Sequence, residues 1–365
     1  CQALQQRGHE VVLAYRRPPI ESAESVEKAV REKALKGVDA FHLEPFSKPH
    51  EIYRLKNIFS DIMGIARYID QERFDIVNFH NSHDHIVGGI AVRASKRRPP
   101  AIRMDHKRDS LKVDLVSRWF FRRYTDGLIT FSERSRERLV RDLGFSPQQV
   151  AKVATALDLI RFDPHKGYKN MRSVFGIPPS APVVGIVARF QRYRRTDILL
   201  EAISLLIRDV PHVRLLLVGR SSQIRESVLD PIKKLGIERN TFLTGYRMED
   251  YLDTLACMDI FVLISPGSDG TARALREAMA MGKPVVVTRK GMLPELVNDG
   301  VNGFVLDERP EAFYQALLAL IKDENLRRIM GNSSYEMARR EFRIEHQAAE
   351  VEDFYMQIME ADKGP

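Results

Sequence analysis

The sequence predicts an α/β protein made of two doubly wound domains, each an open parallel sheet covered by helices on both faces. Short apolar runs of strand length alternate with amphipathic segments along most of the chain, which is the pattern of repeated βα units. A length of 365 residues suits two domains better than one. A proline-containing stretch at 163–180 marks the point where a second set of strand-like runs begins.

The first domain is expected to span residues 1–165. Residues 1–8 are typical of a helix end closed by glycine, and a long amphipathic helix is expected at 52–70. The strands expected in this domain lie at 10–15, 38–43, 74–79, 101–104, 127–131 and 150–155. Because the domain opens in mid-helix and without an initiating Met, we expect roughly 15–25 residues, supplying one strand and a glycine-rich turn, to be missing before Cys1.

The second domain is expected to span residues 166–343. Its expected strands lie at 183–188, 213–218, 241–243, 260–264, 285–288 and 304–306. Two doubly wound domains that face each other leave a cleft between the carboxyl ends of their sheets. The ligands are therefore expected at the loops that follow the strands.

The stretch 260–288 predicts a parallel βαβ unit. The apolar run at 260–264 is typical of a strand buried on both faces, and 285–288 is the next strand. Between them, a helix is expected to begin near Thr271 and to end at Gly282. The ligand site of such a unit lies at the loop after its first strand.

The polar groups at this helix entrance suit a ligand. Asp269 precedes the helix, and an entrance with N–H groups that lack helical partners attracts anions or sugar hydroxyls. These N–H groups belong to Gly270, Thr271 and Ala272. Glu277 follows roughly 12 Å along the helix axis, so the two carboxylates are too far apart to share a proton but could grip the two ends of one elongated ligand. The alternative is that Asp269 caps the helix and Glu277 is a solvated helix residue.

A second loop with a strong charge signal follows the strand at 183–188. Its four arginines are Arg189, Arg192, Arg194 and Arg195. A guanidinium group is always charged and presents a planar fork to phosphate oxygens, so this loop suits a diphosphate. The alternative is a solvated basic loop.

Two histidines lie at the ends of expected strands of the first domain. His80 follows the strand at 74–79, and His106 comes two residues after the strand at 101–104. The carboxyl ends of parallel strands carry ligand groups, although a lone histidine is more often structural. The nearby His83 and His85 raise the alternative of a metal site.

The positive charge of the chain is concentrated in one segment. Residues 93–123 hold 11 basic and 3 acidic side chains, so this segment carries a net charge of +8, equal to that of the whole chain. Within it, Leu111, Leu115 and Trp119 recur at helical spacing. We expect either a face that sits on an anionic membrane and reaches a lipid-linked acceptor, or a helix packed on its own sheet with a solvated basic edge. Nucleic acid is disfavoured, because no RNA- or DNA-reading motif is present.

Other features of the sequence exclude several classes of protein. The chain has no run of 18 apolar residues and no signal-peptide pattern. Its two cysteines, Cys1 and Cys257, indicate a reducing compartment without a disulfide framework. No G-x-G-x-x-G follows any visible strand, which disfavours an NAD-dependent oxidoreductase.

The stretch from Asp269 onward resembles the E-x7-E element of retaining GT-B glycosyltransferases of the family 4 type, the group 1 glycosyltransferases. The family form is roughly E-G-F-G, three residues, then L-E-A-M-A-x-G-x-P-V-V. This chain has D-G-T-A-R-A-L-R-E-A-M-A-M-G-K-P-V-V. The tail from Glu277 to Val286 matches closely, whereas Asp269 and the pair Thr271-Ala272 are departures.

The arginine loop supports the same resemblance. The family has G-R-L, three residues, K-G, then D-x-L-L-x-A, and alignment through 197–202 places the family arginine on Arg189 and the family lysine on Arg194. The glycine that follows is replaced by Arg195. The alignment leaves open whether Arg194 or Arg195 holds the phosphate.

The resemblance implies a GT-B fold, a nucleotide-diphosphate sugar as donor, no cofactor and no metal. It implies that Arg189 and Arg194, or Arg195, hold the diphosphate and that Glu277 binds the ribose. It places Asp269, with the amides of Gly270, Thr271 and Ala272, at the sugar. It places His106 beside the transferred sugar, His80 near the acceptor, and Gly219 and Tyr246 toward the nucleotide. It also implies that a last helix, within 344–365, crosses back to the first domain.

The sequence and the resemblance together predict a retaining glycosyltransferase of envelope polysaccharide synthesis. Its acceptor would be a glycan, a lipopolysaccharide or a lipid-linked sugar, and its place would be the cytoplasm or the inner face of the membrane. Two alternatives remain open. One is a nucleotide-sugar epimerase on the same fold, and the other is a non-catalytic nucleotide-sugar binder, which the departures at Asp269 and in the arginine loop favour.

Overall fold

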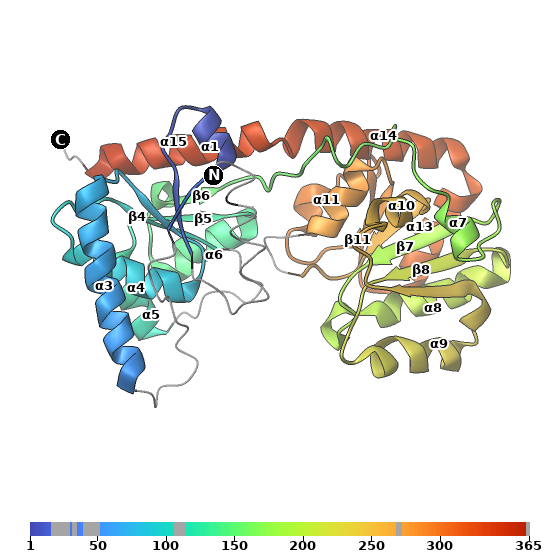
Figure 1. Ribbon diagram of the computed structural model, residues 1–365. Coiled ribbons are helices and arrows are strands. Elements are labelled where there is room, and N and C mark those ends of the chain that lie inside the picture. Colours follow the sequence, from blue (N-terminus) through green and yellow to red (C-terminus); the bar gives the residue numbers. More distant parts are fainter. Residues whose placement is uncertain (16–29, 31–34, 39–51, 106–113, 268–271, 363–365) are drawn as a thin grey trace. The chain divides into compact units, whose positions relative to one another are not determined.

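The computed structural model describes residues 1–15, 30, 35–38, 52–105, 114–267 and 272–362. The chain forms two compact units (Figure 1). Unit 1 contains Cys1–Ala154 together with Ile344–Pro365, and unit 2 contains Thr155–Arg343. The sequence placed the corresponding boundaries after residues 165 and 343.

Unit 1 is built on a four-stranded parallel sheet with the order β3-β4-β5-β6. Its strands are β3 (Val77–Phe79), β4 (Ala101–Met104), β5 (Gly127–Thr130) and β6 (Val150–Lys152). A separate parallel pair joins β1 (Val12–Ala14) and β2 (Lys36–Val38). The strand expected at 38–43 overlaps β2 only at its first residue, and residues 39–51 lie outside the described part of the chain.

Helices cover both faces of the unit 1 sheet. They are α1 (Gln2–Gln6), α3 (Ile52–Glu72), α4 (Ser82–Ala94), α5 (Leu115–Tyr124), α6 (Glu133–Leu143) and α15 (Ile344–Asp362). Apolar side chains at alternate positions of β4 and β5 face α15, where Ile102 and Ile129 pack with Phe354 and Ile358. The opposite alternation buries Leu128 of β5 with residues of α5 and α6. Strands buried on both faces explain the continuous apolar runs in the sequence.

Unit 2 contains a six-stranded parallel sheet with the order β12-β11-β10-β7-β8-β9. Its strands are β7 (Val183–Val187), β8 (Arg214–Val218), β9 (Thr241–Gly245), β10 (Ile260–Leu263), β11 (Val285–Thr288) and β12 (Gly303–Leu306). The chain runs outward from β7 through β9, returns to pair β10 with β7, and then runs outward on the other side. The order therefore reverses between β7 and β10, which makes this place the topological switch point of the sheet.

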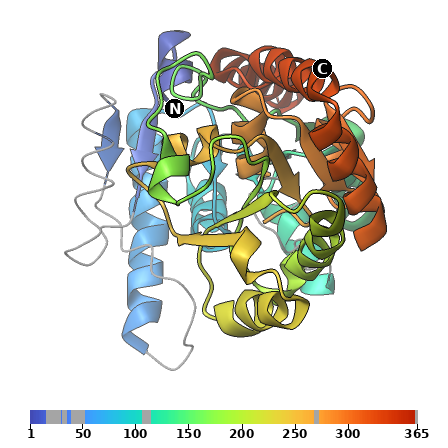
Figure 2. The same cartoon turned by 90° about the vertical axis from the view of Figure 1, so that its right-hand side faces the viewer.

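Helices cover both faces of the unit 2 sheet as well, as Figure 2 shows. The helices are α7 (Met171–Val174), α8 (Thr196–Asp209), α9 (Asp230–Leu235), α10 (Tyr251–Ala256), α11 (Arg273–Ala280), α12 (Leu293–Leu296), α13 (Pro310–Lys322) and α14 (Glu324–Glu341). Residues of α11 pack on one face, and residues of α8 and α13 pack on the other. Two parallel sheets, each covered on both faces, confirm the predicted α/β class.

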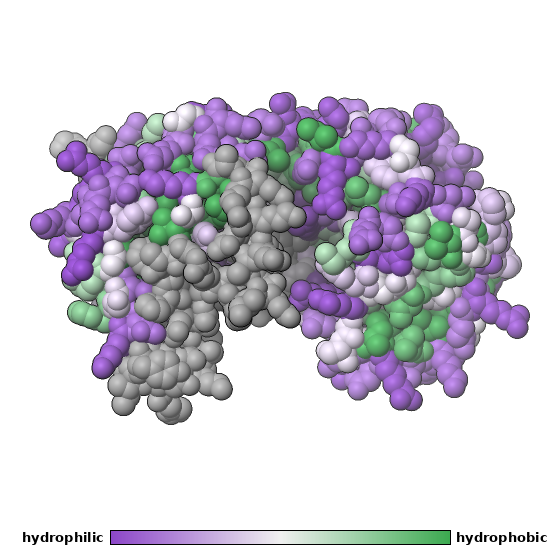
Figure 3. Space-filling model, viewed as in Figure 1, coloured by the Kyte–Doolittle hydropathy of each residue, from purple (hydrophilic) through white to green (hydrophobic). Residues whose placement is uncertain are grey.

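The surface of the described residues is largely polar on the face drawn in Figure 3. None of the helices that the structure describes combines the length and the apolar character needed to cross a bilayer.

Candidate functional site

The candidate site lies at the carboxyl edge of the unit 2 sheet, where the loops after β7 and β10 leave the switch point. These are the two loops that the sequence singled out, at 189–195 and 264–272. Because β7 and β10 are hydrogen-bonded neighbours, their loops start side by side. Asp269, Gly270 and Thr271 lie outside the described residues, and so does His106 of unit 1.

Arg194 joins the two loops. It ends a short 3-10 turn (Arg192–Arg194) after β7, and its Nη1 donates a hydrogen bond of 2.8 Å to the carbonyl oxygen of Ser265, after β10. A Cβ atom built on Gly267 would lie 2.8 Å from Nη2 of Arg194. The guanidinium group therefore lies directly against the chain that leads into α11.

Arg195 makes different contacts although it is the next residue. Its backbone is left-handed, with φ +53°, and its guanidinium forms ion pairs of 3.1 Å with Asp197 and with Glu308. The hydrogen bonds that Arg195 donates to the Asp197 carboxylate are the main reason why the pKa of Arg195 is raised above its ordinary value. Two carboxylates of unit 2 thus balance Arg195, whereas Arg194 is the one that faces the loop after β10.

Glu277 lies on α11 with its carboxylate buried. The residue is 5% exposed, so the alternative of a solvated helix residue is wrong. Tyr251 donates its phenol hydrogen to Oε2 of Glu277 at 2.5 Å, and Nε of Arg273 donates to Oε1 at 2.8 Å. Burial and the nearby charge of Glu277 raise the pKa of Tyr251 far above its ordinary value.

Helix α11 begins two residues later than the sequence predicted. The helix starts at Arg273 instead of near Thr271. Ala272 takes the N-cap position without a side-chain cap and is 2% exposed. An alanine there supplies no capping oxygen, so the first N–H groups of α11 receive no hydrogen bond from the side chain at its cap.

Gly219 and Tyr246 follow the next two strands, β8 and β9. Gly219 has φ +143°, and a Cβ atom there would lie 1.9 Å from the carbonyl oxygen of Ala188. This contact explains why a glycine is needed where β8 ends beside β7. Tyr246 is 60% exposed, and the guanidinium of Arg220 lies 4.8 Å from its ring centroid. Arg189, after β7, is also exposed.

One unit 1 candidate, His80, lies at the carboxyl edge of the unit 1 sheet, where it directly follows β3 and is exposed. His85 is 2% exposed on α4, and its Nε2 lies 2.7 Å from Oγ1 of Thr125. Burial, with a smaller effect of the Arg103 charge, lowers the pKa of His85 to about 3. His85 is therefore a neutral core residue. No group of three or more potential metal ligands occurs among the described residues.

Three residues near these edges escaped the sequence analysis. Tyr251 and Arg273 hold Glu277, but neither shows this in the sequence because a single tyrosine or arginine is common on any helix. Arg103 of β4 is 0% exposed, and its guanidinium nitrogens have no hydrogen-bond partner among the described residues. In the sequence, Arg103 could have been noticed as a charged residue between Ile102 and Met104 in a short apolar run.

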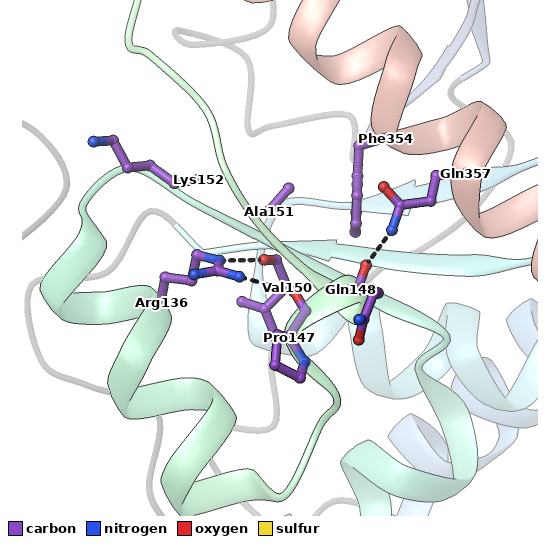
Figure 4. Close-up of a pocket in the computed structure, with 8 residues that line it drawn as sticks. All are labelled: Arg136, Pro147, Gln148, Val150, Ala151, Lys152, Phe354 and Gln357. Carbon is purple, nitrogen blue, oxygen red and sulfur yellow. Dashed lines mark hydrogen bonds between the residues drawn. The ribbon is translucent and has the colours of Figure 1, made fainter.

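A surface hollow of about 380 Å³ lies elsewhere on unit 1, at the edge strand β6 (Figure 4). Arg136 of α6 donates to the carbonyl oxygen of Val150 at 2.8 Å, and Gln357 of α15 donates to that of Gln148 at 2.9 Å. The lining contains none of the predicted site residues. We therefore do not assign this hollow to the site.

Two family models match the chain, one on each unit. The model described as Glycosyl transferases group 1 matches residues 181–323, and the one described as Glycosyltransferase Family 4 matches residues 1–161. Together they cover most of both units. The chain belongs to the group 1 glycosyltransferases of the family 4 type, and its fold is the GT-B fold of those enzymes.

Curated relatives carry the names of several sugar-transferring enzymes. The N-acetyl-alpha-D-glucosaminyl L-malate synthase of Bacillus anthracis is 28% identical over 53% of this chain and 50% of its own. The D-inositol 3-phosphate glycosyltransferase of Corynebacterium urealyticum is 31% identical over 58% of this chain and 51% of its own. The chain thus spans about half the length of these two relatives. The UDP-Gal:alpha-D-GlcNAc-diphosphoundecaprenol alpha-1,3-galactosyltransferase of Escherichia coli is 23% identical over 82% of this chain and 79% of its own.

Solved structures share the fold at low sequence identity. A glycosyltransferase from Rickettsia africae superposes with a TM-score of 0.80 at 16% identity, covering 98% of this chain and 92% of its own. HepE of Anabaena, solved in complex with UDP-glucose, superposes with a TM-score of 0.72 at 19% identity, covering 100% of this chain and 94% of its own.

Proposed function

We propose that this protein is a retaining glycosyltransferase that moves a sugar from a nucleotide-diphosphate sugar to a glycan or lipid-linked acceptor. The observation that carries the proposal is the bond from Arg194 to the Ser265 carbonyl. It brings the basic loop after β7 against the start of the loop after β10, at the edge where open parallel sheets bind their ligands. Membership of the group 1 glycosyltransferases supplies the reaction class.

In this proposal the donor diphosphate lies between the two loops. Breaking the anomeric bond leaves positive character on the sugar and negative charge on the diphosphate. Arg194 and the exposed Arg189 would hold this charge, and each fixed donor of this kind contributes about 3–4 kcal/mol to transition-state binding. Arg195, already paired with two carboxylates, would shape the loop and not contact the phosphate.

The remaining roles follow the family pattern. Glu277 would bind the ribose, Asp269 and the helix-entrance amides would orient the sugar, and Tyr246 would lie toward the base. On the acceptor side, His106 would contact the transferred sugar and His80 would lie near the acceptor. The transfer would use no metal and no cofactor. A nucleotide-sugar donor is also supported by the solved complex of HepE with UDP-glucose.

The acceptor is proposed to belong to envelope polysaccharide synthesis, with the protein in the cytoplasm and at an anionic membrane surface. Helix α5 supports the membrane part, because Leu115, Val116 and Trp119 are 83%, 74% and 60% exposed. The arginines exposed on the same helix are Arg118, Arg122 and Arg123. With 3.6 residues per turn these apolar and basic side chains share an arc of about 160°. A helix that exposes apolar and basic side chains together has the composition of an interfacial helix. The relative from Escherichia coli, whose name includes a diphosphoundecaprenol-linked sugar, supports a lipid-linked acceptor.

The test is a matched pair of arginine variants. Nucleoside diphosphate release is measured with a panel of nucleotide sugars and acceptors. Arg194→Ala should lower turnover roughly 10²–10³-fold, whereas Arg195→Ala should lower it less than about tenfold because its carboxylate partners lie within the fold. A loss below threefold for Arg194→Ala, or equal losses in the two variants, would contradict the assignment.

Product stereochemistry tests the mechanism and the alternatives. NMR of the new glycosidic bond should show the anomeric configuration of the donor, and an inverted product would exclude retention. An epimerase would instead yield an isomerised sugar nucleotide without any acceptor. A non-catalytic protein would bind the donor and release no nucleoside diphosphate with any acceptor.

A further inference from the structure

The Glu277 carboxylate is held from two sides by residues of two different helices. Tyr251 is the first residue of α10 and reaches Oε2, while Arg273, one turn before Glu277 on α11, reaches Oε1. The Glu277 side chain is 6% exposed and that of Arg273 is 72% exposed. The carboxylate thus has a phenol on its buried side and a guanidinium on its solvent side.

A buried carboxylate is costly unless it is paired and hydrogen-bonded. Arg273 supplies an opposite charge, but an exposed i,i+4 ion pair is weak and screened by salt. The hydrogen bond from Tyr251 is the more firmly placed of the two, because the phenol is partly buried. Its raised pKa keeps Tyr251 protonated and able to donate at any physiological pH.

The remaining acceptor capacity of Glu277 suits one kind of ligand. An ionised carboxylate offers about four acceptor positions, two on each oxygen. Tyr251 uses one on Oε2 and Arg273 uses one on Oε1. With respect to the described residues, each oxygen keeps one further position, and two adjacent hydroxyl groups can fill both without displacing either partner.

We propose that Tyr251 is a positioning residue that orients Glu277 to accept from both hydroxyls of a vicinal diol, so that the site prefers ribonucleoside diphosphates to their 2′-deoxy counterparts. This inference rests on the proposed function, which places the donor nucleotide at this edge. Tyr251 itself does not contact the ligand. Its effect passes through the direction of the two carboxylate oxygens.

Calorimetric titration tests this role without any catalysis. UDP, GDP and ADP are titrated into the protein, and the tightest binder is compared with its 2′-deoxy form. We expect the wild type to prefer the ribose form by at least about tenfold, the value of one well-made hydrogen bond. In Tyr251→Phe, affinity for the ribose form should fall about tenfold, whereas affinity for the deoxy form should change less than threefold. The ratio of the two affinities should therefore approach one.

The matched control is Tyr168→Phe. Tyr168 also lies in unit 2 and donates its phenol hydrogen at 2.6 Å, but to the carbonyl oxygen of Asp163. This variant should keep the wild-type preference. If Tyr251→Phe does not fold, Arg273→Ala carries the test, because its exposed side chain can be removed without a cavity and the preference should also fall.

The outcomes separate the inference from the function it rests on. Equal weakening of the ribose and deoxy forms in Tyr251→Phe would show a purely structural role and would overturn the inference alone. A wild type that prefers neither form would also overturn it, while leaving donor binding intact. A wild type that binds no nucleoside diphosphate would overturn both the inference and the proposed donor site.

Discussion

At the scale of the residue, the direction of a side chain decides what a charge can do. Arg194 and Arg195 are adjacent and chemically identical, but one donates to the Ser265 carbonyl and the other pairs with Asp197 and Glu308. The 3-10 turn ends at Arg194, and Arg195 follows it with a left-handed backbone, so the two guanidinium groups diverge.

The buried imidazole of His85 should make unfolding sensitive to acid. Its pKa is lowered to about 3 in the fold, against an ordinary value near 6.5 in the unfolded chain. The neutral ring therefore contributes stability that is present above pH 6.5 and is lost as the pH falls toward 3. We expect the free energy of unfolding of unit 1 to fall by up to about 1.4 kcal/mol per pH unit from this group.

Urea unfolding of the wild type and of His85→Gln at pH 7, 6, 5 and 4 measures this contribution. Glutamine has no titrating group, so the variant should lose stability more slowly as the pH falls. Parallel pH profiles for the two proteins would mean that His85 is not the group responsible.

The glycine at the end of β8 should be intolerant of any side chain. In Gly219→Ala the new Cβ meets the Ala188 carbonyl oxygen at 1.9 Å, and backbone atoms cannot move aside cheaply. We expect a loss of about 3 kcal/mol or more in the unfolding free energy of unit 2. Gly236→Ala is the control, because Gly236 has φ +69° and nothing within 4 Å of its Cβ position, so only about 1–2 kcal/mol of backbone strain is expected. Similar urea midpoints for the two variants would contradict the clash.

At the scale of the element, α5 shows that one helix can carry two apolar faces. Phe121 is 7% exposed and packs into unit 1, while Leu115 and Trp119 are exposed on the other side. Periodicity in the sequence detects apolar spacing, but it does not show which of two faces the sheet covers.

Trp119 is the only tryptophan of the chain, so its fluorescence reports directly on this helix. With vesicles that contain phosphatidylglycerol, we expect the emission to shift to shorter wavelength, and we expect high salt to weaken the shift by screening the arginines. Leu115→Ser should weaken vesicle binding, whereas Phe59→Ser, at a 67% exposed position of α3, should not. An equal shift with zwitterionic vesicles, or no shift, would contradict an anionic membrane surface.

At the scale of the whole molecule, the last helix belongs to unit 1, although it follows unit 2 in the sequence. Helix α15 follows unit 2 in sequence but contributes Phe354 and Ile358 to the core of unit 1. Two bonds of 2.7 Å also tie it to the backbone of Ala154, one accepted by Glu350 and one donated by Gln347. Unit 1 is therefore complete only when the end of the chain is present.

Replacing a buried residue of α15 should destabilise unit 1 and leave unit 2 unchanged. Phe354 is 5% exposed, so Phe354→Ala should cost about 3–5 kcal/mol. Met356 is 48% exposed on the same helix, so Met356→Ala should stay within about 0.5 kcal/mol. Hydrogen exchange resolved by peptide should show faster exchange in β4 and β5 for the first variant only. Faster exchange in β7 and β10 as well would contradict the assignment of α15 to unit 1.

The sequence by itself determined the α/β class and most strand positions, and it pointed to the two loops of the candidate site, because apolar periodicity and the residues after each strand are local properties. Only the tertiary structure decided that Arg194 faces the loop after β10, that Glu277 is buried against Tyr251, and that α15 completes unit 1. Each of these depends on contacts between residues far apart in the chain. One sequence does not show such contacts, because they arise only when the strands take their order in the sheet and the helices close over it.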